Sequence, residues 1–133
     1  ASGLALDPIV DNAFAGRAAD VEILFAKAMA AGTYPGLIIM SAQRHAALLH
    51  KARLSVDEGR SEYEALESGF PRLHFSRKTL VETALRNAST ERMARAMAQL
   101  ADAAFDMRKQ SSLAEVIAQR ALLAIAVNAR RRG

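Results

Sequence analysis

The chain of 133 residues contains no cysteine and no tryptophan, and aromatic residues make up only 5% of it. Without cysteine it has no disulfides, no thiol nucleophile and no zinc site with thiolate ligands. Scarce aromatics argue against a binding site built as an aromatic cage. No apolar run approaches the roughly 20 residues of a membrane helix, and the first residues lack the charged-then-apolar order of a signal peptide. We therefore expect a cytoplasmic protein that does not enter a membrane.

The composition is that of a globular protein, with 51% hydrophobic and 24% charged residues. A chain of this length buries roughly 68% of its unfolded surface, so its core needs no covalent or metal support. No segment alternates apolar and polar residues as a strand does, whereas helical spacing recurs throughout. The prediction is an all-α fold, a compact multi-helix bundle with short connections.

The clearest predicted element is a long helix from about Pro35 to Glu58. Gly32 suits the left-handed cap of the preceding helix, Pro35 suits the first turn of the next, and Gly59 marks its end. Its apolar face recurs at steps of three and four residues. The residues on this face are Ile38, Ala42, His45, Leu49, Ala52 and Val56.

Ahead of it, Asp7 and Pro8 predict the cap and first turn of a short helix that Gly16 ends. We interpret residues 1–16 as a leading helix, a candidate remnant of a preceding domain, and residues 17–133 as the helical domain. Because the chain begins with Ala1 and not with Met, we expect a longer parent protein. The predicted caps of later helices are Ser61 with Glu64, Ser76, Ser89 or Thr90, and Ser112 with Glu115.

Two further helices are predicted from their apolar patterns. The next-to-last helix has a packing seam at steps of four and three residues, made by Met93, Met97, Leu100, Ala104 and Met107. The last helix carries apolar residues around most of its circumference, so we expect it to be central and buried on several sides. We expect the run from Asn128 to Gly133 to be frayed.

The sequence contains no recognisable catalytic or metal-binding motif. His45 and His50 are five residues apart on one helix, whereas helical metal pairs use three or four. We interpret His45 as a partly buried, hydrogen-bonded packing residue. The serines are explained as caps, and the dispersed glycines form no phosphate loop. The sequence predicts no catalytic residue, no metal and no cofactor.

Basic residues are unevenly spread along a chain of formal net charge +4, and they concentrate in three stretches, Arg44 to Arg53, Arg72 to Lys78 and Arg130 to Arg132. One basic stretch contains Arg72, Arg77 and Lys78, which is a candidate phosphate-facing group. The alternative is an ordinary solvated helical surface. Because the charge excess is modest and no aromatic residues interleave, the second interpretation is favoured for this domain.

The segment from Phe70 to Phe75 is the one connection with bulky apolar residues and no helical signal. Pro71 favours an extended backbone at Phe70, in which Phe70, Leu73 and Phe75 would point the same way. They either cover the core or form an apolar contact for a neighbouring subunit. We retain these three residues as candidate subunit-interface residues.

Several segments together resemble a known family. They are Asp11-Asn12-Ala13-Phe14-Ala15-Gly16, the helix from Val21 to Ala31 with Gly32-Thr33-Tyr34-Pro35, Gln43-Arg44-His45 with Leu48, Leu49 and Arg53, Phe75-Ser76-Arg77-Lys78, and Met93-Ala94-Arg95-Ala96 with Leu100, Ala101 and Ala104. In order and spacing they resemble the C-terminal domain of the delta subunit of bacterial DNA polymerase III, a clamp-loader component. The likeness covers nearly the whole chain.

The resemblance implies an oligomerisation domain. In that family the domain packs with gamma/tau-type and delta-prime subunits into a collar, which holds together the complex that loads the sliding clamp on primed DNA during replication. Delta-type subunits do not hydrolyse ATP, although the parent belongs to a DNA-directed DNA polymerase holoenzyme, a nucleotidyltransferase. The resemblance therefore implies no small-molecule substrate, and contact with DNA through the assembled complex.

Two other classes of function stay open at this stage. A helical nucleic-acid-binding module would use the basic stretches and would lose affinity steeply with salt. A small helical enzyme would need convergent acid and base residues. The only carboxylate-rich region, Asp57 to Glu67, spans a helix end and a capping box, which account for two of its members.

Overall fold

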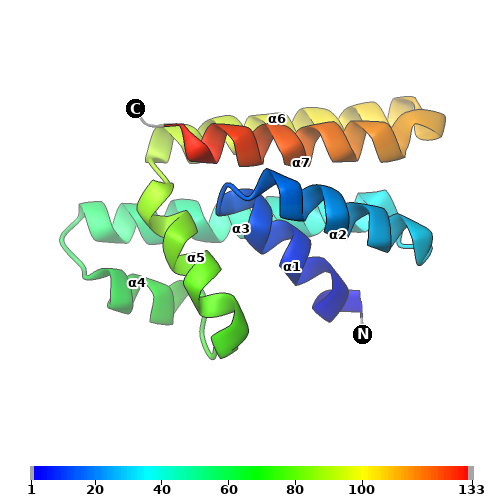
Figure 1. Ribbon diagram of the computed structural model, residues 1–133. Coiled ribbons are helices and arrows are strands. Elements are labelled where there is room, and N and C mark those ends of the chain that lie inside the picture. The colour runs from blue at the N-terminus through cyan, green and yellow to red at the C-terminus, as the bar shows by residue number, and fades with distance from the viewer. Residues whose placement is uncertain (1, 132–133) are drawn as a thin grey trace.

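The computed structural model describes the backbone of residues 2–131 and the side chains of residues 6–131. Within that range every regular element is a helix, and there is no strand (Figure 1). Its elements are α1 (Ser2–Phe14), α2 (Ala18–Ala30), α3 (Pro35–Asp57), α4 (Glu62–Gly69), α5 (Phe75–Asn87), α6 (Thr90–Lys109), the 3₁₀ helix η1 (Ser111–Leu113) and α7 (Ala114–Arg130). The predicted all-helical bundle is confirmed.

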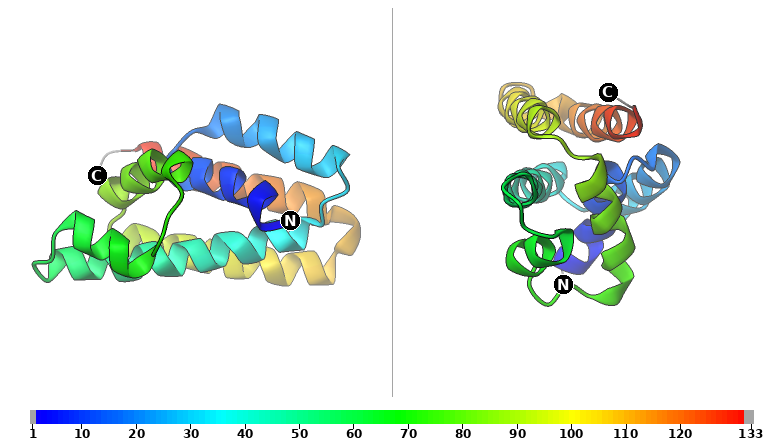
Figure 2. Two further views of the ribbon diagram at one scale, coloured as in Figure 1. Left: turned by 90° about the horizontal axis from the view of Figure 1, so that it is seen from below. Right: turned by 90° about the vertical axis from the view of Figure 1, so that its left-hand side faces the viewer.

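The helices are arranged around α1 and α3. α6 and α7 form an antiparallel hairpin along one side, and α3 runs antiparallel to α6 beneath it (Figures 1 and 2). α3 makes its most extensive contact with α6. α4 and α5 pack near the C-terminal end of α3, whereas α1 contacts α2, α3, α5 and α7. The predicted leading helix is thus part of the same packed bundle.

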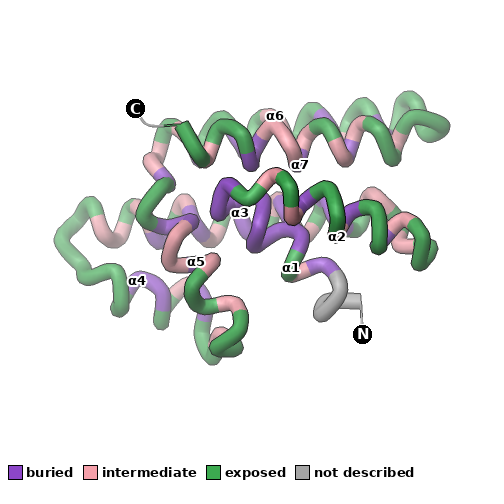
Figure 3. The backbone as a smooth tube through the Cα atoms, viewed as in Figure 1, coloured by how far each residue is buried: buried purple, intermediate pink, exposed green. Residues whose placement is uncertain are grey.

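A single hydrophobic core runs between these helices, on the inner faces of the bundle (Figure 3). Small side chains, including Ala42 and Ala46 of α3 and Ala96 of α6, are buried in it. Alanine allows helix backbones to approach closely. The largest fully buried apolar side chains are Phe25, Ile9, Ile38, Ile39, Leu49, Leu85, Leu100, Leu122, Val10, Val21 and Val81.

The predicted limits of α3 are confirmed to within a residue. Pro35 occupies its first turn, and the helix ends at Asp57. Gly32 and Gly59 have φ values of 83° and 109°, a left-handed conformation that disfavours side chains. The predicted apolar face is buried from Ile38 to Ala52, with Val56 half-buried.

The predicted capping box at the start of α4 is present. The Ser61 hydroxyl accepts a hydrogen bond from the Glu64 backbone at 3.1 Å, and the Glu64 carboxylate accepts one from the Ser61 backbone at 3.3 Å. The Ser61 hydroxyl also donates to the Glu64 carboxylate at 3.1 Å, and the two hydrogen bonds that this carboxylate accepts from Ser61 lower the pKa of Glu64. α4 has only eight residues, so its local stability depends strongly on this cap.

We expect Ser61→Ala to lower the free energy of unfolding by about 1 kcal/mol, because it removes an N-cap acceptor. Chemical denaturation measures this change. Ser68→Ala on the exposed surface of the same helix is the matched control and should have little effect. Equal losses in the two variants would contradict a capping role.

Three predicted helix starts are wrong. α1 contains Pro8 in its interior, and Asp7 does not cap it but pairs with Arg77. His74, not Ser76, caps α5, because its Nδ1 accepts the Ser76 backbone N–H at 3.2 Å. The predicted Ser112 cap is replaced by η1, after which α7 begins without a side-chain cap. Ser89 caps α6, as one of the two predicted alternatives.

The residues that α6 and α7 bury are not all those that the sequence predicts. In α6 the buried seam is Met93, Ala96, Leu100, Ala103 and Met107, so the predicted Met97 and Ala104 lie beside it. α7 buries one face only, and its Val116 and Val127 are exposed. The expected central position is found, since α7 contacts α6, α1, α2 and α3, but its fully buried residues lie on one face and not on several. α7 remains helical to Arg130, and Arg132 and Gly133 of the expected frayed run lie outside the described residues.

Within residues 2–131, one helical segment, Ser111–Arg130, has the length and apolar composition of a membrane-spanning helix. By length and apolar composition, this segment contradicts the expectation that no apolar run approaches the length of a membrane helix. The same segment packs on α6, α1, α2 and α3. An apolar helix that packs in a bundle passes the same test of composition.

Candidate functional site

A buried ion pair joins the first helix to the fifth. Asp11 on α1 is only 1% exposed and accepts two hydrogen bonds from Arg77 on α5. The Arg77 Nε to Asp11 Oδ2 distance is 2.8 Å, and the Nη2 to Oδ1 distance is 3.0 Å. Arg77 Nη1 lies 3.2 Å from the carboxylate of Asp7. This fork geometry is the strong, directional form of an arginine–carboxylate pair.

His45 lies beside this pair on α3 and is 4% exposed. Its ring is 5.2 Å from that of Phe14 and 5.3 Å from that of Phe70. His45 Nε2 is 3.8 Å from Asp11 Oδ1, which is too long for a hydrogen bond, and among the described residues Nε2 has no partner. The expected burial of His45 is confirmed, but the expected hydrogen bonding is not found at Nε2.

Burial controls the protonation of this cluster. Burial, and then the charge of Arg77, lowers the pKa of His45 to about 3, so the ring is neutral near pH 7. Burial also raises the pKa of Asp11, against the lowering effect of Arg77. The nearby Asp11 carboxylate does not stabilise a charged His45, because Arg77 already neutralises it.

The cluster has the residue types of acid–base chemistry but not the access. Asp11 and His45 are buried, so a substrate does not reach them. Within residues 6–131, no group of three or more His, Asp or Glu side chains is arranged to hold a metal ion. We interpret the cluster as a clamp between α1, α3 and α5.

The candidate interface residues do not share one orientation. Phe70 is 7% exposed and packs against His45 in the core, Leu73 is half-buried, and Phe75 is 82% exposed. Phe75 begins α5, so the extended backbone expected through it ends at His74. The ring of His74 lies 4.6 Å from that of Phe75. Of the three, only Phe75 is fully available to a partner.

The candidate phosphate-facing residues are not brought together as a basic group. Arg77 is held by Asp11 and Asp7. Arg72 is exposed in the loop before α5, at a φ of 56°. Lys78 lines a depression that also contains Glu62, Glu67 and Glu82, where carboxylates oppose the approach of a phosphate.

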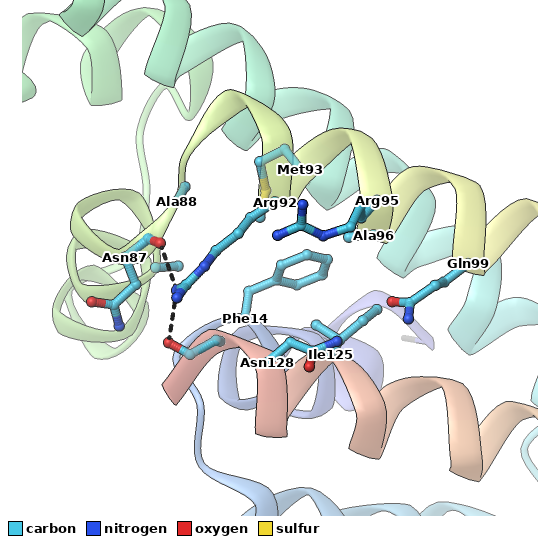
Figure 4. A pocket seen from close by; sticks show the side chains of 12 residues that line it. Phe14, Asn87, Ala88, Arg92, Met93, Arg95, Ala96, Gln99, Ile125 and Asn128 are labelled. Carbon is cyan, nitrogen blue, oxygen red and sulfur yellow. Dashed lines mark hydrogen bonds between the residues drawn. The ribbon is translucent and has the colours of Figure 1, made fainter. Parts of the chain in front are cut away.

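A different basic site lies where α5, α6 and α7 meet (Figure 4). Two adjoining hollows share Asn87, Ala88, Arg92 and Ala129 in their walls. We call them together the arginine groove, defined by Arg86, Arg92, Arg95, Arg130 and Arg131. No acidic residue of the described chain lines either hollow. In Figure 4, Arg92 and Arg95 extend from α6 over the hollow in which Phe14 lies.

Sequence reasoning missed this groove because its arginines come from three separate elements. Arg130 and Arg131 were visible only as part of a terminal basic run. Arg86, Arg92 and Arg95 are spread across the end of one helix and the start of the next. The one usable signal was the basic residue density on both sides of the predicted turn at Asn87 to Thr90.

An exposed apolar surface lies on the opposite flank of α6. Arg92, Arg95 and Gln99 face α7, since they line a hollow with Ile125 and Asn128. Met97 and Phe105, eight residues apart, therefore lie on the flank away from α7. Figure 2 (right) shows that no other helix covers this side of the α3 and α6 pair.

α3 contributes to the same uncovered side through residues opposite its buried face. We define the α3–α6 face by its exposed large apolar residues, which are Leu37, Met40, Leu54, Met97 and Phe105. Met40 is 57% exposed and Phe105 is 53% exposed. Exposed apolar side chains that share one side of a protein are candidates for an interaction surface.

No protein family, no curated protein and no solved structure matches this chain.

Proposed function

We propose that this chain is a collar-type oligomerisation domain of a clamp-loader delta subunit, and that it assembles with gamma/tau-type and delta-prime subunits. In this role it has no catalytic activity of its own. It orients the rest of its parent protein while the complex loads the sliding clamp on primed DNA. The proposal rests on the resemblance in segment order and spacing described above.

The observation that carries the proposal is the α3–α6 face. Its five large apolar side chains are exposed on two adjacent helices, and burying such a surface against a partner is favourable by about 25 cal/mol per Å² of apolar area. Arg44 and Lys51 are exposed on α3 between Met40 and Leu54. Such a mixture of an apolar centre with charged neighbours is common at subunit interfaces.

The experiment is a binding assay between this chain and the gamma/tau-type and delta-prime subunits of the same source. We expect the double variant Met40→Lys/Phe105→Lys to weaken assembly by about 100-fold, because each change places an unpaired charge at the centre of a buried apolar contact. The affinity is measured by titration calorimetry, with circular dichroism used to verify that the variant is folded.

The matched control is Ile23→Lys/Val116→Lys, which also replaces two exposed apolar residues but on α2 and α7. It should leave the affinity within a few-fold of the parent value. If the two double variants bind equally well, the α3–α6 face is not the assembly surface. If only the control weakens binding, the surface lies on α2 and α7 instead.

A further inference from the structure

We propose that the arginine groove binds the phosphate backbone of a nucleic-acid strand. This inference goes beyond the assembly function, because the groove lies on the α7 side of α6 and the α3–α6 face lies on the other. It also differs from the basic stretch around Arg72 that the sequence suggested.

Charge is the first argument. Five arginines of α5, α6 and the end of α7 line the two adjoining hollows, and no acidic residue of the described chain lies in their walls. Arg86 lies 3.7 Å from Glu62, but within residues 6–131 Arg95, Arg130 and Arg131 form no ion pair. Gathering like charges in a concave site raises the local potential and concentrates anions.

Pre-organisation is the second argument. The Arg92 guanidinium donates hydrogen bonds to the backbone carbonyls of Asn87 at 3.2 Å and of Ala129 at 3.4 Å, which ties the start of α6 to the end of α7 (Figure 4). A side chain at Gly16 would come within 2.7 Å of Arg130 Cγ. Gly16 therefore leaves room for the stem of Arg130 at the groove.

The shape of the groove favours a strand over a single phosphate group. Arg95 lines one of the two adjoining hollows and Arg131 the other, with Arg92 shared between them. Cations spaced along two adjoining hollows suit successive phosphates of a backbone. The one aromatic ring in the walls, Phe14, is buried and offers no surface on which a base stacks. We therefore expect binding without sequence preference.

The test measures fluorescence anisotropy of a labelled single-stranded oligonucleotide and of its duplex with this chain, over a series of salt concentrations. The groove variant is Arg95→Gln/Arg130→Gln/Arg131→Gln, whose three side chains line the hollows. The control variant, Arg44→Gln/Lys51→Gln/Arg108→Gln, removes the same charge from exposed positions elsewhere. Thermal melts verify that both variants remain folded.

We expect salt-sensitive binding that the groove variant weakens by about tenfold or more. The slope of log affinity against log salt should become shallower by about 0.7–0.9 for each phosphate that the variant no longer neutralises. The control should change affinity by less than about threefold. Equal weakening in both variants would overturn the proposal, since it indicates diffuse attraction, as would no binding of either oligonucleotide at low salt.

A competition experiment distinguishes a nucleic-acid strand from a small phosphorylated molecule as the ligand of the groove. Pyrophosphate that displaces the oligonucleotide at comparable concentrations would assign the groove to small phosphorylated molecules and overturn the assignment to a strand. We expect pyrophosphate to compete only weakly, because it engages fewer arginines at once. The assay contains no clamp-loader subunit, so its failure does not bear on the proposed assembly function.

Discussion

Asp11→Ala should lower the free energy of unfolding by about 2–3 kcal/mol, because it removes two charge-assisted hydrogen bonds but leaves Arg77 partly exposed and paired with Asp7. Asp11 is 1% exposed and accepts both hydrogen bonds of the Arg77 fork, across 66 residues of sequence. Its removal leaves the Arg77 guanidinium without its main partner and opens a space beside His45. Urea denaturation of the two proteins measures the difference.

Asp57→Ala is the matched control, because Asp57 pairs with Arg53 at 3.0 Å near the surface. Exposed pairs of this kind contribute about 0–1 kcal/mol. If Asp11→Ala costs no more than Asp57→Ala, the cluster does not act as a clamp between α1 and α5. An Asp11→Ala/Arg77→Ala double variant then measures how much of the cost is coupling between the two residues.

Acidification should destabilise the fold through His45. The folded protein holds this ring neutral with a pKa of about 3, whereas the unfolded chain protonates it near its ordinary value of 6.5. Below pH 6.5 the unfolded state therefore binds one proton more than the folded state, and stability falls with falling pH. The expected slope is about 1.4 kcal/mol per pH unit, or about 2–3 kcal/mol by pH 4.5.

The contribution of His45 is isolated by comparison with His45→Gln, which has no titrating ring. Asp11, which faces His45, acts in the opposite direction. Its pKa in the folded protein is raised above the ordinary value of 3.8, so the folded state takes up its proton first, and falling pH stabilises the fold through Asp11 between these two values. The difference between the two proteins in chemical denaturation, measured from pH 7 to pH 4.5, should follow the slope above. Parallel pH profiles would contradict a neutral buried His45.

Sequence reasoning located most helix boundaries because their signals are local. Gly32, Gly59 and Pro35 act through the backbone conformation of one or two residues, and Ser61 and Glu64 are three residues apart. Such signals depend little on the rest of the fold. The errors at Ser76 and Ser112 also concern local signals, where neighbouring residues offered a competing cap or a 3₁₀ turn.

The start of α1 was missed for a tertiary reason. Pro8 lies inside α1 and lacks the N–H that would continue the hydrogen-bond ladder, so the pattern predicted a helix start there. In the fold, α1 packs against four other helices, and Asp7 is engaged by Arg77 of α5. Packing outweighs the missing hydrogen bond in a way that no local pattern reports.

The functional surfaces were the least predictable part. The exposure of Met97 beside a seam that uses Ala96 depends on where α3 lies, and the burial of Phe70 depends on His45, 25 positions earlier in the chain. The arginine groove needs the end of α7 beside the start of α6. Helical periodicity identifies faces, but only the packing of helices decides which face stays uncovered.

The most direct test of the assembly function is size-exclusion chromatography with light scattering of this chain mixed with gamma/tau-type and delta-prime subunits, at low and at moderate salt. We predict a complex of defined mass that persists at moderate salt, because an apolar contact is little screened by ions. Separate elution of all components at both salt concentrations would contradict the proposed function.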